Sequence, residues 1–236
     1  FYTSLRYASI AEGFLPNLGI NLRKFLLAVG VTGLFAGLAV LLYQPFGQWF
    51  GQAYTALDVY KGDRSAFWSF ITHWGLFLFI LISWFIQESL DWMIKTPASR
   101  LKVLIPYKSI IQLLAGLFVL AVVFLTLQKI FIGWLALGMA AWSLILLLRP
   151  GQPDSKRLAL FMVGTAFTIT LAVELVTLRG DLGRMNTVFK FYLQAWSMFA
   201  VSSGAALIWL MPEIRKLRVR WLKTTWIIGL VAIVGG

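Results

Sequence analysis

The sequence lacks cysteine altogether and contains one histidine, His73. Without cysteine, the chain cannot form disulfides, use a catalytic thiol or bind a metal through sulfur. A single histidine cannot build a histidine-based metal cluster within the chain. We therefore predict no metal site, and the sequence indicates no particular cofactor.

Acidic residues are also scarce, with nine Asp and Glu against 21 Lys and Arg and a formal net charge of +12. In a soluble protein this balance would suggest a nucleic-acid partner. However, 60% of the residues are hydrophobic and only 13% are charged, which is unlike a soluble domain. We therefore predict no nucleic-acid partner and an integral membrane protein in contact with membrane lipids.

The hydropathy pattern predicts the fold class, because apolar runs of about 20 residues recur and each could cross the bilayer. We expect an all-α, polytopic transmembrane helical bundle with six full spans and a partial seventh. We expect residues 1–236 to form a single transmembrane domain. Because the sequence starts with Phe1 and ends in a short apolar run, we expect it to be part of a longer protein. The expected spans are 25–43, 69–87, 110–127, 130–148, 158–178 and 191–211, followed by 224–236.

Lys and Arg are distributed unevenly between the two sides of this predicted bundle. One side holds only six of the 21 cations, namely Lys61, Arg64, Lys129, Arg179, Arg184 and Lys190. The positive-inside rule places this side outside and the amino end in the cytoplasm, in the plasma (cytoplasmic) membrane. The loop 88–108, which mixes apolar and basic residues, is predicted to lie on the cytoplasmic leaflet.

The most polar part of the sequence is the hairpin between the fifth and sixth spans, from Glu174 to Trp196. Ionisable groups are costly in or near a membrane, so such a cluster suggests a functional site. The plainer alternative is a hairpin with ordinary interfacial charges. The polar residues that make this segment unusual are Asp181, Arg184, Asn186, Lys190 and Gln194.

Two geometric expectations follow for this hairpin. Glu174 and Lys190 lie about equally far from its tip, so we expect them to pair at matching depth. His73 lies in the same layer of the second span, either as a ligand-binding side chain or as an ordinary packing residue.

The residues after the tip have a helical spacing of their own. Asn186, Lys190 and Gln194 follow an i, i+4, i+8 pattern and would share one helix face, which must contact protein or water. Arg184 adds a fork-shaped donor that suits phosphate, and a helix start presents backbone amides to anions. We expect Arg184, Asn186 and Lys190 to form an anion-binding wall, with Gln194 and His73 as further substrate-binding candidates.

The block Arg184-Met-Asn-Thr-Val-Phe-Lys-Phe-Tyr-Leu-Gln-Ala-Trp196, with Glu174-Leu-Val before it, resembles the signature of the Chlor_Arch_YYY family of multi-spanning membrane proteins. Tyr43-Gln-Pro-Phe46 and Trp74-Gly-Leu-Phe-Leu-Phe79 also resemble family segments in the same order. The tip Thr177-Leu-Arg-Gly-Asp181 departs from the family pattern, which has a more aromatic approach to the aspartate. The general pattern of this family is similar to that of C-type glycosyltransferases.

This resemblance implies a membrane glycosyltransferase-like protein that uses a polyprenyl-phosphate-linked sugar donor on the extracytoplasmic side. In that reading the cations bind the lipid phosphate, and the catalytic carboxylate is expected in an outward loop that precedes Phe1. Glu174 and Asp181 are the fallback candidates for the catalytic base. Two alternatives stay open. One is a non-catalytic subunit of a larger membrane complex with partner subunits, and the other is a lipid or solute transporter.

Overall fold

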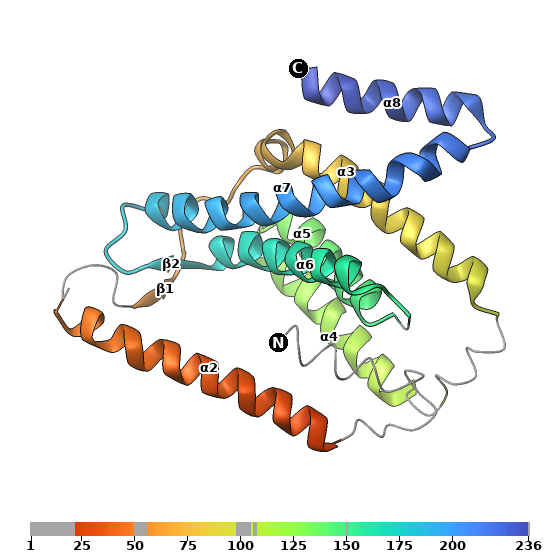
Figure 1. Ribbon diagram of the computed structural model, residues 1–236. Helices are drawn as coiled ribbons and strands as arrows, with labels where there is room; N and C mark the ends of the chain where they lie inside the picture. The colour runs from red at the N-terminus through yellow and green to blue at the C-terminus, as the bar shows by residue number, and fades with distance from the viewer. Residues whose placement is uncertain (1–21, 50–55, 98–104, 106–107, 150, 236) are drawn as a thin grey trace.

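The computed structural model describes residues 22–49, 56–97, 105, 108–149 and 151–235 (Figure 1). Within these residues, five helices are long and apolar enough to cross a membrane, namely α2, α3, α4, α6 and α7. The apolar helix α5 is shorter, with 16 residues. The bounds of the helices are α2 (Leu22–Trp49), α3 (Phe67–Lys95), α4 (Lys108–Leu127), α5 (Ile132–Leu147), α6 (Asp154–Leu175), α7 (Met185–Lys216) and α8 (Arg220–Gly235).

The prediction of an all-α membrane protein is therefore confirmed, while the number of spans and the orientation stay predictions. Each predicted span coincides with a helix, but several ends differ. Helix α3 continues past residue 87 to Lys95, so the predicted loop 88–108 begins too early. Residues 98–104 of that loop lie outside the described residues. Helix α6 ends at Leu175 because Val176–Leu178 forms a strand.

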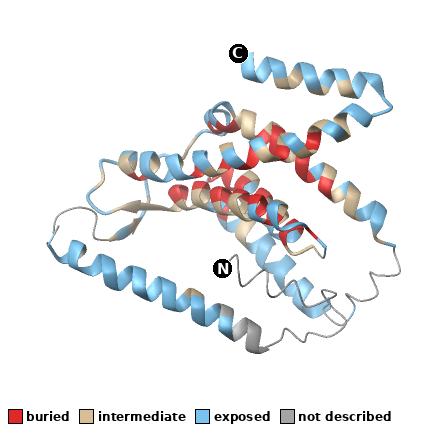
Figure 2. Ribbon diagram, in the orientation of Figure 1, coloured by how far each residue is buried: buried red, intermediate tan, exposed pale blue. Residues whose placement is uncertain are grey.

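The core lies between α3, α5, α6 and α7, where the buried residues of Figure 2 are concentrated. Helix α6 packs between α5 and α7, and α7 also packs against α3. Large aromatic side chains fill this core: the Phe199 ring lies 4.7 Å from Phe167 and 5.3 Å from Trp74, both edge to face. Ala166, Ala195 and Ala206 are fully buried, and small side chains of this kind let membrane helices approach closely.

Helices α2 and α4 contribute little to this core. The described side chains of α2 are exposed along nearly the whole helix, and α4 buries only Leu125. A Cβ added to Gly133 of α5 would lie 2.9 Å from the Leu125 side chain, so this glycine permits the close contact between α4 and α5. The apolar faces of α2 and α4 are suited to lipid or to other membrane helices.

A short antiparallel pairing, which the sequence analysis did not predict, joins two distant segments of the chain. Strand β1 (Leu57–Val59) pairs with β2 (Val176–Leu178), with Leu57 opposite Leu178. Backbone bonds from Arg179 to Ala56 (2.8 Å) and from Tyr60 to Leu175 (2.9 Å) extend the ladder at both ends. This pairing holds the segment before α3 against the α6–α7 turn and thereby positions the site.

Candidate functional site

Glu174 is fully buried at the carboxyl end of α6. Its carboxylate lies 2.6 Å from the Arg184 guanidinium and accepts hydrogen bonds from the Ser65 amide (3.1 Å) and hydroxyl (2.7 Å). The predicted pairing of Glu174 with Lys190 is therefore corrected: its ion-pair partner is Arg184. The physical reason is that the turn places Arg184 directly beside the end of α6, whereas the Lys190 side chain is exposed.

The Arg184 guanidinium is engaged by several groups of the protein itself. It donates to the Val173 carbonyl (3.2 Å) and to the Ser65 hydroxyl (2.9 Å), and it lies 4.7 Å above the centre of the Tyr60 ring. Its side chain is only 12% exposed. Arg184 therefore joins the α6–α7 turn to the segment before α3, instead of standing in an open anion-binding wall.

Asp181 caps the start of α7. The turn before the helix uses left-handed backbone at Gly180 (φ 85°) and Gly183 (φ 66°), which glycine adopts without strain. The Asp181 carboxylate then accepts bonds from the backbone amides of Asn186 (3.1 Å) and Thr187 (2.8 Å) and from both of their side chains. Such bonds satisfy amides that would otherwise lack partners in the first helical turn.

The same contacts govern the ionisation of Asp181. Desolvation raises the pKa of the carboxyl group, but the hydrogen bonds from Thr187 and Asn186 outweigh it and lower the pKa to about 2. A general base works best with a pKa near the operating pH and with an accessible lone pair. The geometry thus gives Asp181 a structural part and provides no local support for its predicted role as a base.

The other predicted binding residues are distributed over the outer surface of α3 and α7. The amide side chain of Asn186 is bound to Asp181, while Lys190 and Gln194 are exposed along α7. His73 is exposed on α3, with its ring 4.4 Å from Trp74 and 6.0 Å from Tyr192. The predicted residues thus form the Glu174–Arg184 pair, the Asp181–Asn186 cap and a separate exposed set.

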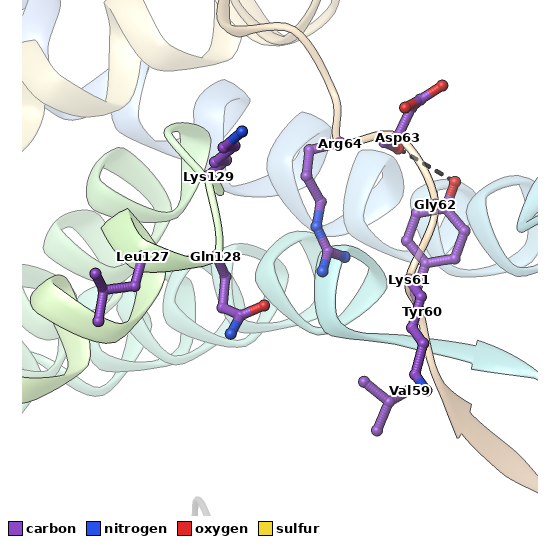
Figure 3. A pocket seen from close by; sticks show the side chains of 9 residues that line it. All are labelled: Val59, Tyr60, Lys61, Gly62, Asp63, Arg64, Leu127, Gln128 and Lys129. Atoms are coloured by element: carbon purple, nitrogen blue, oxygen red, sulfur yellow. Dashed lines mark hydrogen bonds between the residues drawn. The ribbon is translucent and has the colours of Figure 1, made fainter.

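A cavity of about 580 Å³ lies between the loop after β1 and the tight turn that joins α4 to α5 (Figure 3). Three cations line it: Lys61, Arg64 and Lys129. They are half of the six cations that the sequence analysis assigned to the cation-poor side. We call this space the cationic cavity, and its full lining is Val59, Tyr60, Lys61, Gly62, Asp63, Arg64, Leu127, Gln128 and Lys129.

Arg64 connects the cationic cavity with the buried Glu174. Its guanidinium donates to the backbone carbonyl of Glu174 and lies 5.4 Å from the centre of the Tyr60 ring. In Figure 3 the Arg64 side chain lies between Tyr60 and Gln128. The sequence analysis missed this site because nothing local reveals that the α4–α5 turn meets the loop after β1. The only sequence signal was the concentration of outward cations at Lys61, Arg64 and Lys129.

A family model for uncharacterised membrane proteins, DUF2298, matches residues 3–199, which is well over half of the chain. The chain belongs to the DUF2298 family. No curated protein and no solved structure matches it. The matched residues include the cationic cavity, the Glu174–Arg184 pair and the Asp181 cap. Membership of this family of uncharacterised membrane proteins shows that the chain is a membrane protein and assigns it no activity.

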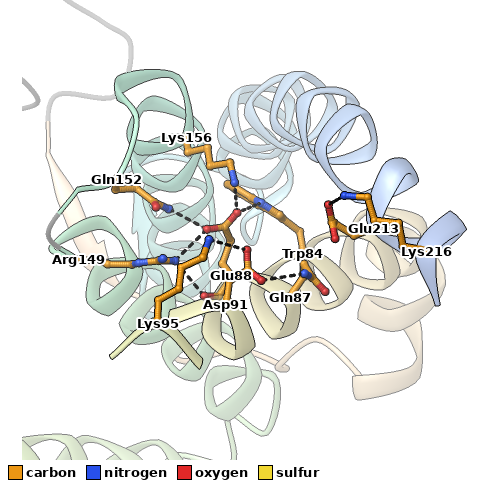
Figure 4. A network of polar contacts seen from close by, with 10 residues as sticks. All are labelled: Trp84, Gln87, Glu88, Asp91, Lys95, Arg149, Gln152, Lys156, Glu213 and Lys216. Atoms are coloured by element: carbon orange, nitrogen blue, oxygen red, sulfur yellow. Dashed lines mark hydrogen bonds and ion pairs between the residues drawn. The ribbon is translucent and has the colours of Figure 1, made fainter. Parts of the chain in front are cut away.

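This DUF2298 protein has a second buried polar network, at the other end of α3 (Figure 4). Glu88, which is 3% exposed, accepts bonds from Arg149 (3.2 Å), Gln152 (3.3 Å), Lys156 and the Trp84 indole (3.3 Å). The prediction that a loop begins at Glu88 was wrong, because Glu88 lies inside α3. Its carboxylate is surrounded by donors, and it ties α3 to the α5–α6 connection.

Within the described part of this DUF2298 protein, no group of three or more His, Asp or Glu side chains is arranged to hold a metal ion. Lys61, Arg64 and Lys129 give the lining of the cationic cavity three positively charged side chains. Guanidinium and ammonium groups are the usual phosphate ligands in proteins.

Proposed function

We propose that this DUF2298 protein is a membrane glycosyltransferase-like protein whose cationic cavity binds the phosphate of a polyprenyl-phosphate-linked sugar. The observation that carries the proposal is the gathering of Lys61, Arg64 and Lys129 around one cavity. These residues come from two distant segments on the side that is predicted to face outward. A lipid whose tail stays in the membrane would present its phosphate at this level.

The proposed reaction breaks the bond between the anomeric carbon of the sugar and the phosphate oxygen. The phosphate leaves with the bonding electrons as polyprenyl phosphate, while an acceptor oxygen forms the new bond to the sugar and gives its proton to a base. The cations of the cavity would stabilise the charge that develops on the leaving phosphate. Arg64 suits this role because its planar fork can contact two phosphate oxygens.

The base in this proposal is Asp63. The sequence analysis proposed Glu174 and Asp181, but both carboxylates already accept several hydrogen bonds within the protein. Asp63 is exposed and lines the cationic cavity together with Lys61 and Arg64. A base must come within hydrogen-bond reach of the acceptor proton, and Asp63 is the carboxylate closest to meeting this condition at the cavity.

Direct binding tests the proposal. The protein in lipid nanodiscs is titrated with a farnesyl-phosphate-linked hexose, and the dissociation constant is measured for the wild type and for Lys61→Met, Arg64→Met and Lys129→Met. A charge-assisted contact contributes about 1.5–3 kcal/mol, so each variant should weaken binding roughly tenfold or more. Arg179→Met is the matched control, because Arg179 is an exposed cation bound to Asp58 and does not line the cavity. Equal affinities in all variants, or no binding by the wild type, would refute the proposal.

A second candidate function is that of a non-catalytic subunit. It is favoured by the exposed apolar faces of α2 and α4, which are large enough to contact partner helices. In this case the protein should purify with other membrane proteins, and variants of Lys61 and Arg64 should leave the activity of that assembly unchanged. Loss of sugar transfer in those variants would exclude this alternative.

A further inference from the structure

We infer that the cationic cavity selects a phosphate monoester dianion over a phosphodiester monoanion. This inference rests on the proposed function and adds the charge state of the ligand. In the proposed reaction, the sugar-linked donor is a phosphodiester and the released polyprenyl phosphate is a monoester. The cavity would therefore hold the leaving group more tightly than the donor.

The first support is the charge of the cavity lining. Lys61, Arg64 and Lys129 carry positive charge and Asp63 carries negative charge, which leaves a net charge of +2. Two ion pairs formed by residues outside this lining cancel in charge: the buried pair Glu174–Arg184 and the exposed pair Asp58–Arg179. A phosphodiester has one negative charge, whereas a monoester approaches two above its second pKa of about 6. The two negative charges of the monoester therefore equal the net positive charge of the cavity lining.

The second support is the arrangement of the donors. Arg64 projects from the loop after β1 with one guanidinium nitrogen fixed on the Glu174 carbonyl, so its remaining N–H groups have a defined direction. Lys61 lies on the same loop, and Lys129 comes from the α4–α5 turn, where its backbone is left-handed (φ 56°). A monoester has three terminal oxygens and can offer one to each cation. A diester has two and leaves one cation without a matched acceptor.

The third support is that the loop is built tightly enough to hold this arrangement. The Tyr60 hydroxyl donates to the Asp63 carbonyl (3.1 Å) and closes the loop on itself. A Cβ added to Gly62 would lie 2.5 Å from that hydroxyl, so glycine allows the ring to pack over the loop. The Tyr60 ring is also covered by the Arg184 and Arg64 guanidinium groups. The Arg64 donor is thus held in place before a ligand arrives, which reduces the entropic cost of binding.

The selectivity has a consequence for the proposed reaction. As the sugar–phosphate bond breaks, the phosphate changes from a monoanion toward a dianion. A site that binds the dianion better than the monoanion lowers the barrier, because only interactions that strengthen in the transition state accelerate a reaction. The same preference would make release of polyprenyl phosphate slow.

The test compares three ligands with the full chain in nanodiscs: farnesyl phosphate, farnesyl methyl phosphate (a diester) and inorganic phosphate. Dissociation constants are measured by calorimetry at pH 7.5 and pH 5. Farnesyl phosphate should bind at least about tenfold more tightly than the diester at pH 7.5, and most of this preference should vanish at pH 5, where the monoester is a monoanion. The affinity for the diester should change little with pH, which shows that the ligand and not the protein titrates.

Variants connect the selectivity to the lining. Lys61→Met and Lys129→Met should each reduce the preference for the monoester more than they reduce binding of the diester. The double variant Asp58→Asn/Arg179→Met removes a neutral ion pair outside the lining and should leave the preference unchanged. Equal binding of monoester and diester at pH 7.5 would overturn this inference but leave the proposed function standing. Absence of binding by both lipids would overturn the proposed function itself. If inorganic phosphate binds as tightly as farnesyl phosphate, the occupant is free phosphate and the assignment to a lipid is wrong.

Discussion

The Arg184 guanidinium and the Glu174 carboxylate form an ion pair of 2.6 Å at the end of the α6–α7 hairpin, with side chains that are 12% and 0% exposed. Around this pair, Ser65 contacts both partners, and Arg64 contacts the Glu174 backbone. The pair is thus the point at which the hairpin and the wall of the cationic cavity are joined. Changes at either partner should therefore affect both stability and ligand binding.

The first prediction concerns this pair. Glu174→Gln or Arg184→Met leaves one buried charge without its partner, which should destabilise the protein by about 3–5 kcal/mol. The double variant Glu174→Gln/Arg184→Met should recover much of that loss. Unfolding free energies in mixed micelles test this coupling. Lys190→Met is the matched control and should have a small effect, since Lys190 is exposed. Additive losses at Glu174 and Arg184 would show that the two residues are not coupled.

The second prediction concerns the network at the other end of α3. Glu88→Gln removes the negative charge that balances Arg149 and Lys156, so a loss of about 3–5 kcal/mol is again expected. Asp91→Asn, three residues further along the same helix, is the control. Asp91 forms an exposed pair with Lys95 at 3.7 Å, and such pairs contribute at most about 1 kcal/mol. The losses of stability are measured by thermal unfolding. Similar losses in the two variants would contradict the conclusion that the buried ion pairs of Glu88 stabilise the protein.

The third prediction concerns the acid stability of the α7 cap. The pKa of Asp181 is lowered to about 2 by its hydrogen bonds, so the ionised carboxylate contributes stability above its ordinary pKa of about 4 and loses it as the pH falls through about 2. Asp181→Asn keeps an acceptor but cannot ionise. The advantage of the wild type over this variant should therefore be constant at pH 5–7 and shrink steadily between about pH 4 and pH 2.

Unfolding midpoints measured from pH 2 to pH 7 provide this test. Asp58→Asn is an informative comparison, because the Arg179 side chain lowers the pKa of Asp58 through a hydrogen bond at an exposed position. Solvent and salt screen that interaction, so the effect of Asp58→Asn should be smaller than that of Asp181→Asn. An advantage of the wild type that does not change with pH would show that the Asp181 cap does not depend on its charge.

The fourth prediction concerns orientation. Because the chain has no cysteine, single cysteines at Leu182, Gln128 and Ser155 can be labelled without background, and all three positions are exposed. The distribution of Lys and Arg predicts that Leu182 and Gln128 react with an impermeant thiol reagent in intact cells, while Ser155 is protected. Labelling of Ser155 and protection of Leu182 would reverse the orientation and place the cationic cavity in the cytoplasm.

The helices were predictable because hydropathy depends on the local sequence alone. Every expected span overlaps a helix, including the partial span at α8, although the span expected at 158–178 runs into strand β2. Helix ends were less predictable, because hydrogen bonds to particular partners decide them. Helix α7 begins at Met185 instead of 191 because Asp181 caps its first turn. Helix α3 continues past residue 87 because the polar side chain of Glu88 accepts hydrogen bonds from Arg149 and Lys156.

The site was less predictable for the same physical reason. The sequence indicated that Glu174 would need a cation, and matching depth suggested Lys190. Depth does not fix which helix face a side chain occupies, and Arg184 reaches the carboxylate directly from the turn. The cationic cavity depends on the pairing of Leu57–Val59 with Val176–Leu178. Strands of three residues have no distinctive pattern, so no rule of spacing reveals that they meet.

The contact between Arg64 and Glu174 also constrains how the protein is made, because the two residues are 110 positions apart. At a synthesis rate of about 5–20 residues per second, Arg64 waits roughly 5–20 s before Glu174 has been translated. During this interval α3, α4 and α5 are synthesised while the loop after β1 is still without its partner strand. The contact that holds Arg64 therefore forms late in biosynthesis, and a chain interrupted between α5 and α6 would carry all the residues of the cavity lining without the Glu174 carbonyl that fixes Arg64.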